Sequence, residues 1–168
     1  MIKKLLPTYI FESVDKIPFK VLEKEGIKGL MFDLDNTLTN HHNILDEEKR
    51  EWIKEAKKRG LKMCILSNTC DIKKVKMYMN EFDINGLSLA MKPFIKGYQF
   101  ALNLLELKKE EVCMIGDQIF TDVLGANRFG IKSILVKPFD KNEAFWVKIK
   151  RPVENVIIYN HEKRQNKV

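Results

Sequence analysis

The sequence predicts an α/β fold in which a parallel sheet is flanked by helices on both faces. Short apolar runs, typical of buried strands, alternate along the chain with segments of helical periodicity. This alternation is typical of βαβ units, in which neighbouring strands run parallel. The apolar runs also end in small polar or charged residues. The 168 residues, of which 45% are hydrophobic and 32% charged, are enough for one globular domain with a full core.

We expect that domain, residues 1–168, to have three parts: an N-terminal lead-in over 1–28, a core over 29–136 that carries the candidate site, and a C-terminal helical extension over 137–168. In the lead-in, Pro18 is placed to open a short helix through about Glu25, and Gly26 to end it. The lead-in is rich in apolar residues, and we favour packing on the core over membrane contact for them. These residues are Leu5, Leu6, Tyr9, Ile10, Phe11, Phe19, Val21 and Leu22.

The core elements follow from apolar runs, capping residues and glycine stops. After an apolar strand at 30–32 we expect a helix from Asp46 to about Arg59, a strand over 61–66, a helix after Asp71, a strand over 86–91, a helix over 97–105, a strand over 112–115, a helix to Phe129 and a strand over 131–136. Two helices should follow at the C-terminus, the second opened by Pro152. The apolar stripes expected in the second and third core helices are Ile72, Val75, Met79 and Phe82, and then Phe100, Ala101, Leu104 and Leu105.

The first core strand delivers two aspartates, Asp33 and Asp35, with Thr37 close behind. In an extended segment residues i and i+2 point the same way, so both carboxylates can face one small volume. A turn is the simpler alternative, since Asp and Asn favour turns. However, unpaired charges cost several kcal/mol each to desolvate. The pair therefore fits the exposed end of a strand with a positive group, such as a metal ion, between the carboxylates.

Polar groups also follow three other predicted strands: Ser67 and Asn68, Lys92, and Asp117 with Asp122. In open α/β sheets, ligands bind beyond the carboxyl ends of the strands. Carboxylates with carbonyls and water form a hard-cation site that suits Mg²⁺. A serine hydroxyl and backbone N–H groups can hold phosphoryl oxygens, and a lysine supplies a point charge for them. The four strand ends together predict a site for Mg²⁺ and a phosphate group.

The order D-x-D-x-T, Ser, Lys and G-D-x(4)-D, from Asp33 to Asp122, resembles the haloacid dehalogenase (HAD) superfamily of phosphohydrolases. The resemblance implies a Rossmann-like sheet and an aspartyl-phosphate mechanism. It implies that Asp33 is the nucleophile, Asp35 the general acid/base and Lys92 the residue that orients the nucleophile. It further implies phosphate binding by Thr37, Ser67, Asn68 and Lys92, and Mg²⁺ binding by Asp33, Asp35 (through its carbonyl), Asp117 and Asp122.

Further features resemble the YqeG-type branch of HAD subfamily IIIA: G-I-K-G before the strand, Lys92-Pro93, G-D-Q, T-D-V-L-G and R-x-x-E near the end. Relatives in that branch include phosphatidylglycerophosphate phosphatases. Many HAD enzymes insert a cap domain after the first or second motif, but here each interval has room for about one helix. We therefore expect no cap domain and an open site, which favours a large phosphorylated substrate such as a lipid headgroup.

The expected function is Mg²⁺-dependent phosphomonoester hydrolysis, with phosphatidylglycerophosphate as the first-choice substrate. The alternatives are a soluble phosphate ester or phosphoprotein as substrate, a phospho-accepting signalling domain, and a scaffold with a silent site. The D-x-D on the first strand argues against a receiver-type domain, whose acceptor aspartate lies on a later strand. An intact set of site residues argues against a silent site.

Charge and cysteine content bear on partners and compartment. The formal net charge of +7 favours anionic partners, and we expect a phosphorylated substrate and peripheral contact with an anionic membrane, but no nucleic acid. Three cysteines without a C-x-x-C pair indicate a reducing compartment, with Cys64 and Cys113 in the core. We expect a cytoplasmic protein, peripheral at the inner membrane face.

Overall fold

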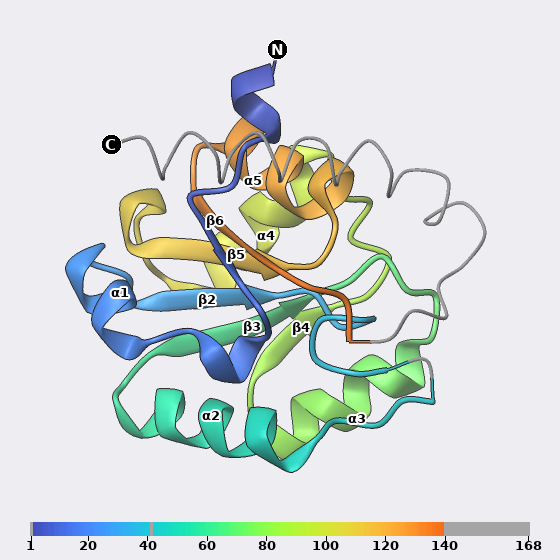
Figure 1. The fold of residues 1–168 in the computed structure, drawn as a ribbon. Helices are drawn as coiled ribbons and strands as arrows, with labels where there is room; N and C mark the ends of the chain where they lie inside the picture. Colours follow the sequence, from blue (N-terminus) through green and yellow to red (C-terminus); the bar gives the residue numbers. More distant parts are fainter. Residues whose placement is uncertain (1, 41, 140–168) are drawn as a thin grey trace.

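A computed structural model describes residues 2–40 and 42–139, and within these ranges six parallel strands form one sheet (Figure 1). The strand order is β1-β6-β5-β2-β3-β4. The strands are β1 (Tyr9–Phe11), β2 (Gly29–Phe32), β3 (Lys62–Leu66), β4 (Asn85–Leu87), β5 (Val112–Gly116) and β6 (Lys132–Val136). The predicted fold class, a parallel sheet with flanking helices, is confirmed.

The strand order of the sheet has a switch point between the neighbouring strands β2 and β5. From β2 the chain moves outward to β3 and β4, whereas from β5 it moves the other way to β6. Strand β2 pairs with both β3 and β5, so the residues that follow β2 lie at the centre of one edge of the sheet. Ligands of open α/β sheets bind at such switch points, beyond the carboxyl ends of the strands.

Helices cover both faces of the sheet. On one face lie α1 (Phe19–Lys24), α2 (Glu47–Lys58) and α3 (Ile72–Phe82), and on the other lie α4 (Ile95–Leu105) and α5 (Leu124–Phe129) (Figure 1). Residues of β2 alternate between the two cores: Leu30 and Phe32 pack beside Trp52 of α2, and Met31 packs beside Tyr98 of α4. The Asp46 and Asp71 side chains accept hydrogen bonds from backbone N–H groups in the first turns of α2 and α3, as the sequence predicted.

The lead-in packs on the core, which confirms the favoured interpretation of its apolar residues. Residues Tyr9–Phe11 form β1, which pairs in parallel with β6 at the edge of the sheet. The side chains of Leu5 and Ile10 pack against a buried cluster beside β6, and Tyr9 and Phe11 pack against the core on the α2 face. These side chains therefore stabilise the fold and are not free to act as a membrane anchor.

Three sequence-based expectations about the elements need correction. In α4 the buried stripe is Tyr98, Ala101, Leu102 and Leu105, while Phe100 is 47% exposed. In α3, Ile72 is exposed and Tyr78 takes its place in the buried stripe with Val75 and Phe82. Strand β4 has only three residues and ends at Leu87, because the chain from 88 to 91 turns away from the sheet. The two helices expected at the C-terminus lie outside the described residues.

Between β2 and β3 the described chain holds α2, and between β3 and β4 it holds α3. These are the two intervals in which the HAD resemblance allows a cap domain, so the carboxyl edge of β2 carries no cap insertion within the described residues. Among the helices of 2–40 and 42–139, none combines the length and the hydrophobicity needed to cross a bilayer.

Candidate active site

Asp33 stands directly after the central strand β2. Its N–H donates to the Ile115 carbonyl of β5 at 2.9 Å, which continues the sheet pairing by one residue. The chain then turns back through Asn36, which has a left-handed backbone (φ 62°), and the N–H groups of Leu38 and Thr39 both donate to the Leu34 carbonyl. This tight turn buries Asp33, which is 5% exposed. It leaves Asp35 at the rim of the site, where the side chain is 49% exposed.

Lys92 supplies the central positive charge of the site. Its Nζ lies 2.6 Å from Asp33 Oδ1 and 2.8 Å from Asp122 Oδ1, and the lysine side chain is only 2% exposed. The amide of Asn68 holds the Lys92 backbone from both sides: Asn68 Nδ2 donates to the Lys92 carbonyl at 2.9 Å, and Oδ1 accepts from the Lys92 N–H at 2.7 Å. The structure thus gives the Asn68 side chain the task of positioning Lys92.

Asp117 and Asp122 come from the segment that follows β5. Asp117 accepts a hydrogen bond at 3.2 Å from the Thr37 hydroxyl, which lies 3.5 Å from Asp33. The Asp122 carboxylate accepts from the Gln118 N–H at 3.1 Å, across a π-helical turn over Ile119–Val123. A Cβ added at Gly116 would lie 2.3 Å from that carboxylate, so glycine is required for this close approach. Asp33, Thr37, Lys92, Asp117 and Asp122, all predicted from sequence, are thereby brought together.

Burial and charge shift the pKa values of the central pair. Burial raises the pKa of Asp33 to about 6; Lys92 opposes this shift, whereas the nearby carboxylates of Asp122 and Asp35 add to it. Burial alone would lower the pKa of Lys92, but the carboxylates of Asp122 and Asp33 outweigh it and hold that pKa above its ordinary value. Lys92 therefore stays charged at neutral pH and screens both carboxylates.

The donor set fits a hard divalent cation. Carboxylate oxygens of Asp33, Asp117 and Asp122, all buried, lie within 4.8 Å of one another. The Lys92 ammonium contacts two of these three carboxylates, those of Asp33 and Asp122. Buried charges are paired or coordinate metals, and oxygen ligands of this kind suit Mg²⁺. The Asp35 carboxylate does not belong to this cluster, and its predicted contribution to the metal was through the carbonyl.

Asp35 is held by a lysine that the sequence analysis did not identify. Lys74 Nζ lies 2.5 Å from Asp35 Oδ1, and the Lys74 side chain is 5% exposed. Lys74 lies in the first turn of α3, where its backbone N–H donates a hydrogen bond to the side chain of the capping residue Asp71. A helix that begins just beyond a site strand directs its first turn toward the site, so a lysine three residues after the cap was the available signal.

Two further buried residues, Ser67 and Tyr98, contribute hydrogen-bonding groups near the site. Ser67 is fully buried at the end of β3, and its hydroxyl accepts from the Thr69 N–H at 3.2 Å, which leaves the hydroxyl hydrogen able to point to a ligand. Tyr98 of α4 lies 3.1 Å from the carbonyl oxygens of both Thr121 and Asp122, so its hydroxyl hydrogen anchors the segment that carries Asp122. This contact was not predicted from the sequence, because it joins residues 23 and 24 positions apart in the chain.

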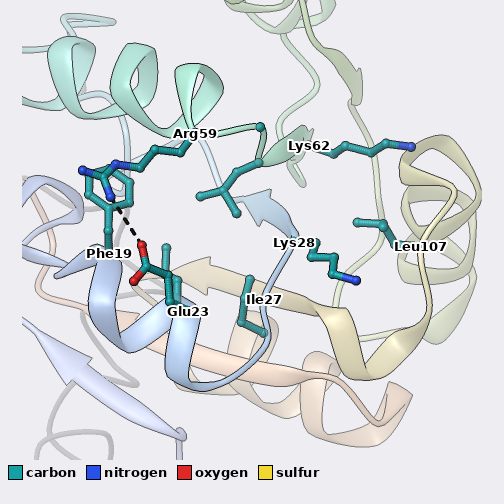
Figure 2. Close-up of a pocket in the computed structure, with 10 residues that line it drawn as sticks. Phe19, Glu23, Ile27, Lys28, Arg59, Lys62 and Leu107 are labelled. Carbon is teal, nitrogen blue, oxygen red and sulfur yellow. Dashed lines mark hydrogen bonds and ion pairs between the residues drawn. The ribbon is translucent and has the colours of Figure 1, made fainter.

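A separate hollow of about 420 Å³ lies at the opposite edge of the sheet, near the start of β2 and β3 (Figure 2). The basic side chains that line this hollow already contact other groups of the protein. The Arg59 guanidinium stacks on Phe19 and lies 3.3 Å from Glu23, Lys28 lies 2.6 Å from Glu111, and Lys62 donates to a backbone carbonyl of α4. This hollow contains none of the predicted site residues, so the acidic cluster remains the candidate active site.

Comparison with known proteins shows the family to which this chain belongs. A family model described as haloacid dehalogenase-like hydrolase matches residues 30–92, and a second, described as HAD-hydrolase-like, matches residues 90–143. A Bacillus subtilis protein named "Probable phosphatase YqeG" is 36% identical over 160 residues, which cover 94% of this chain and 92% of that protein. The chain belongs to the YqeG-type branch of the HAD hydrolases. This membership confirms the resemblance drawn from the sequence motifs and the expectation of a phosphatase-class enzyme.

More distant relatives of this HAD hydrolase are also informative. An Arabidopsis thaliana protein named "Phosphatidylglycerophosphate phosphatase 1, chloroplastic/mitochondrial" is 27% identical over 164 residues; the match covers 92% of this chain but 47% of that protein. Among solved structures, an uncharacterized Listeria monocytogenes protein has a TM-score of 0.56 at 23% identity, covering 80% of this chain and 99% of that one. NagD from E. coli has a TM-score of 0.53 at 12% identity, covering 66% and 87%. These structural likenesses support the fold.

Proposed function

We propose that this HAD hydrolase cleaves phosphomonoesters in a Mg²⁺-dependent reaction that passes through an aspartyl phosphate on Asp33. The observation that carries the proposal is the position of Asp33, at the end of the central strand, ion-paired with Lys92 and beside two further buried carboxylates. A carboxylate is a workable nucleophile toward a phosphate ester when positive groups screen the repulsion between them.

In the first step an oxygen of Asp33 attacks phosphorus, and the bond from phosphorus to the ester oxygen breaks. The leaving alkoxide takes a proton from Asp35, which stands at the rim where a leaving group would emerge. In the second step water attacks the phosphorus of the aspartyl phosphate and gives a proton to Asp35. The bond from phosphorus to the Asp33 oxygen breaks, so that inorganic phosphate leaves and the Asp33 carboxylate is regenerated. Proton transfer of this kind contributes roughly 10²–10⁴-fold to a rate.

The residues proposed to hold Mg²⁺ are the carboxylates of Asp33, Asp117 and Asp122, together with the main-chain carbonyl of Asp35. The ion would neutralise the phosphoryl oxygens and orient them toward Asp33. The proposed phosphate contacts are the hydroxyls of Thr37 and Ser67, the Asn68 region and the Lys92 ammonium. Lys74 would position Asp35 so that its carboxyl faces the leaving group.

We propose phosphatidylglycerophosphate as the substrate. The name of the Arabidopsis relative supports this choice, as does a site edge without a cap insertion in the described residues, which leaves room for a headgroup attached to a bilayer. A soluble ester or phosphoprotein is the competing substrate class. On the same reasoning we propose that residues 1–168 act as one catalytic unit at the cytoplasmic face of the inner membrane.

Phosphate release from a substrate panel tests the proposal. The panel should contain phosphatidylglycerophosphate in vesicles, soluble alkyl phosphates, a phosphopeptide and an aryl phosphate, each measured with and without Mg²⁺. We expect Mg²⁺-dependent turnover, fastest on the lipid, and none by Asp33→Asn. Turnover that persists in excess chelator would refute the metal role, and faster turnover of a soluble ester than of the lipid would refute the substrate.

A further inference from the structure

An exposed apolar surface lies next to the active site. Eight large apolar side chains are exposed among the described residues, and five of them lie within twelve residues. These five, which we call the 89–100 surface, are Leu89, Met91, Phe94, Ile95 and Phe100, with exposed fractions of 56, 66, 58, 51 and 47%. Contiguous exposed apolar patches mark interaction sites on soluble domains, whereas single exposed apolar residues are ordinary. The concentration in one stretch therefore needs a physical reason.

The backbone holds this surface in place. Leu89 and Met91 both have left-handed backbone angles (φ 52° and 55°), which L-residues adopt only at an energetic cost. The loop is tied to the segment that follows β3 by hydrogen bonds from the Leu89 N–H to the Thr69 carbonyl and from the Ala90 N–H to the Ser67 carbonyl. In this arrangement Ala90 and Lys92 point inward while Leu89 and Met91 point to solvent. The fold thus keeps large apolar side chains exposed in a fixed loop.

The shape and charge of the surface restrict its partner. It borders a groove of about 560 Å³, and the charged residues among those described in its lining are Lys96 and Arg128, both basic. A second copy packed on it around a two-fold axis would bring like charges together. An anionic bilayer instead offers an apolar interior for the five side chains and acidic headgroups for the two cations. The chain as a whole carries a formal net charge of +7.

The surface also lies where a membrane-bound substrate would need it. Lys92 follows Met91 directly, and its ammonium contacts Asp33 inside the site. Docking of the 89–100 surface would therefore bring the bilayer to the mouth of the site, where a phosphate on a lipid headgroup can enter. We propose that the 89–100 surface, with Lys96 and Arg128, is the face by which this protein docks on an anionic lipid bilayer, an inference that rests on the proposed lipid substrate.

Vesicle sedimentation tests the docking without requiring turnover. The full chain is mixed with vesicles of phosphatidylcholine alone, or of phosphatidylcholine with phosphatidylglycerol, at low and high salt. We expect binding that requires phosphatidylglycerol and falls with salt. The double variant Phe94→Gln with Phe100→Gln should weaken binding about tenfold or more, because two large apolar side chains lose their burial. Lys96→Gln with Arg128→Gln should weaken binding to the anionic vesicles as well.

The matched control is Met77→Gln, since Met77 is 48% exposed on α3, on the other face of the sheet. It should leave vesicle binding unchanged. Hydrolysis of a soluble aryl phosphate should be the same in wild type, control and double variant, which separates docking from chemistry. If the aryl phosphate is not hydrolysed but the vesicles bind as described, the proposed function fails and the docking surface stands.

Three results would overturn the docking proposal. The first is a wild-type protein that stays in the supernatant with strongly anionic vesicles at low salt. The second is an equal loss of binding in Met77→Gln and in the double variant. The third is a dimer in solution that the double variant converts to a monomer, because the occupant of the surface would then be a second copy of the chain.

Discussion

Replacing Lys92 by methionine removes the cation that joins the buried carboxylates while keeping most of the side-chain volume. Lys92 Nζ contacts Asp33 at 2.6 Å and Asp122 at 2.8 Å, and both carboxylates are almost fully buried. Breaking a buried ion pair by removing one partner typically costs about 3–5 kcal/mol. Domains of this kind have a free energy of unfolding of about 5–15 kcal/mol, so the loss of one such ion pair would remove a large part of it.

The pH dependence of this loss has a definite sign. Burial raises the pKa of Asp33 to about 6, and removing Lys92 takes away the main group that opposes the shift. A carboxyl group whose pKa is raised by folding favours the folded state while protonated, and this contribution disappears as the pH rises through the folded-state pKa. The destabilisation by Lys92→Met should therefore be larger at high pH and shrink as the pH falls toward the wild-type Asp33 pKa of about 6.

Urea unfolding followed by circular dichroism, in chelator, measures the loss. We expect Lys92→Met to lose about 3–5 kcal/mol at pH 7.5, which for a domain of this size corresponds to a fall in Tm of about 6–20 °C. The control Lys76→Met, at an exposed position of α3, should change stability by less than about 0.5 kcal/mol. Adding Asp122→Asn to Lys92→Met should recover part of the loss. A loss below about 1 kcal/mol at pH 7.5 would refute the described network.

Three further predictions concern single groups. Asp35→Asn should slow alkyl phosphate hydrolysis by roughly 10²–10⁴-fold and aryl phosphate hydrolysis much less, since aryl leaving groups need little protonation; equal losses would exclude a general-acid role. Asp117→Ala should abolish the increase in Tm that Mg²⁺ gives the wild type, because a metal ligand is lost; an unchanged increase would remove Asp117 from the site. One thiol, that of the exposed Cys70, should react rapidly in the folded protein, because burial raises the pKa of both Cys64 and Cys113 to about 12; mass spectrometry showing early labelling of a buried cysteine would contradict the packing.

The sequence predicted the parallel core because apolar runs and helix caps are local signals. It did not predict β1, since three residues at the edge of a sheet show no periodicity of their own and form a strand only by pairing with β6. The buried stripe of α4 was also misplaced, with Phe100 assigned to the core. The docking of Gly97 against the Ala90 backbone, where a Cβ would lie 2.5 Å from a carbonyl oxygen, sets which side of the helix faces the sheet.

The site was predictable to the extent that parallel strands bring their carboxyl ends to one edge. Two of the site residues, Asp33 and Asp117, directly follow β2 and β5. The other two, Lys92 and Asp122, lie a few residues beyond β4 and β5, so that all four side chains meet at this edge. Contacts between side chains distant in sequence were not predictable. The ion pair of Lys74 with Asp35 spans 39 residues, and only the docking of α3 beside the loop after β2 brings the two together.

The proposed mechanism requires Asp33 to become covalently phosphorylated during turnover. It is tested most directly by mixing the protein with a phosphomonoester that carries labelled phosphorus, quenching in acid within one turnover, reducing acyl phosphates with borohydride and mapping the product by mass spectrometry. We expect label on the protein in the presence of Mg²⁺, conversion of residue 33 to homoserine on reduction, and neither in Asp33→Asn. Full turnover with no modification at residue 33, or modification at another residue, would contradict it.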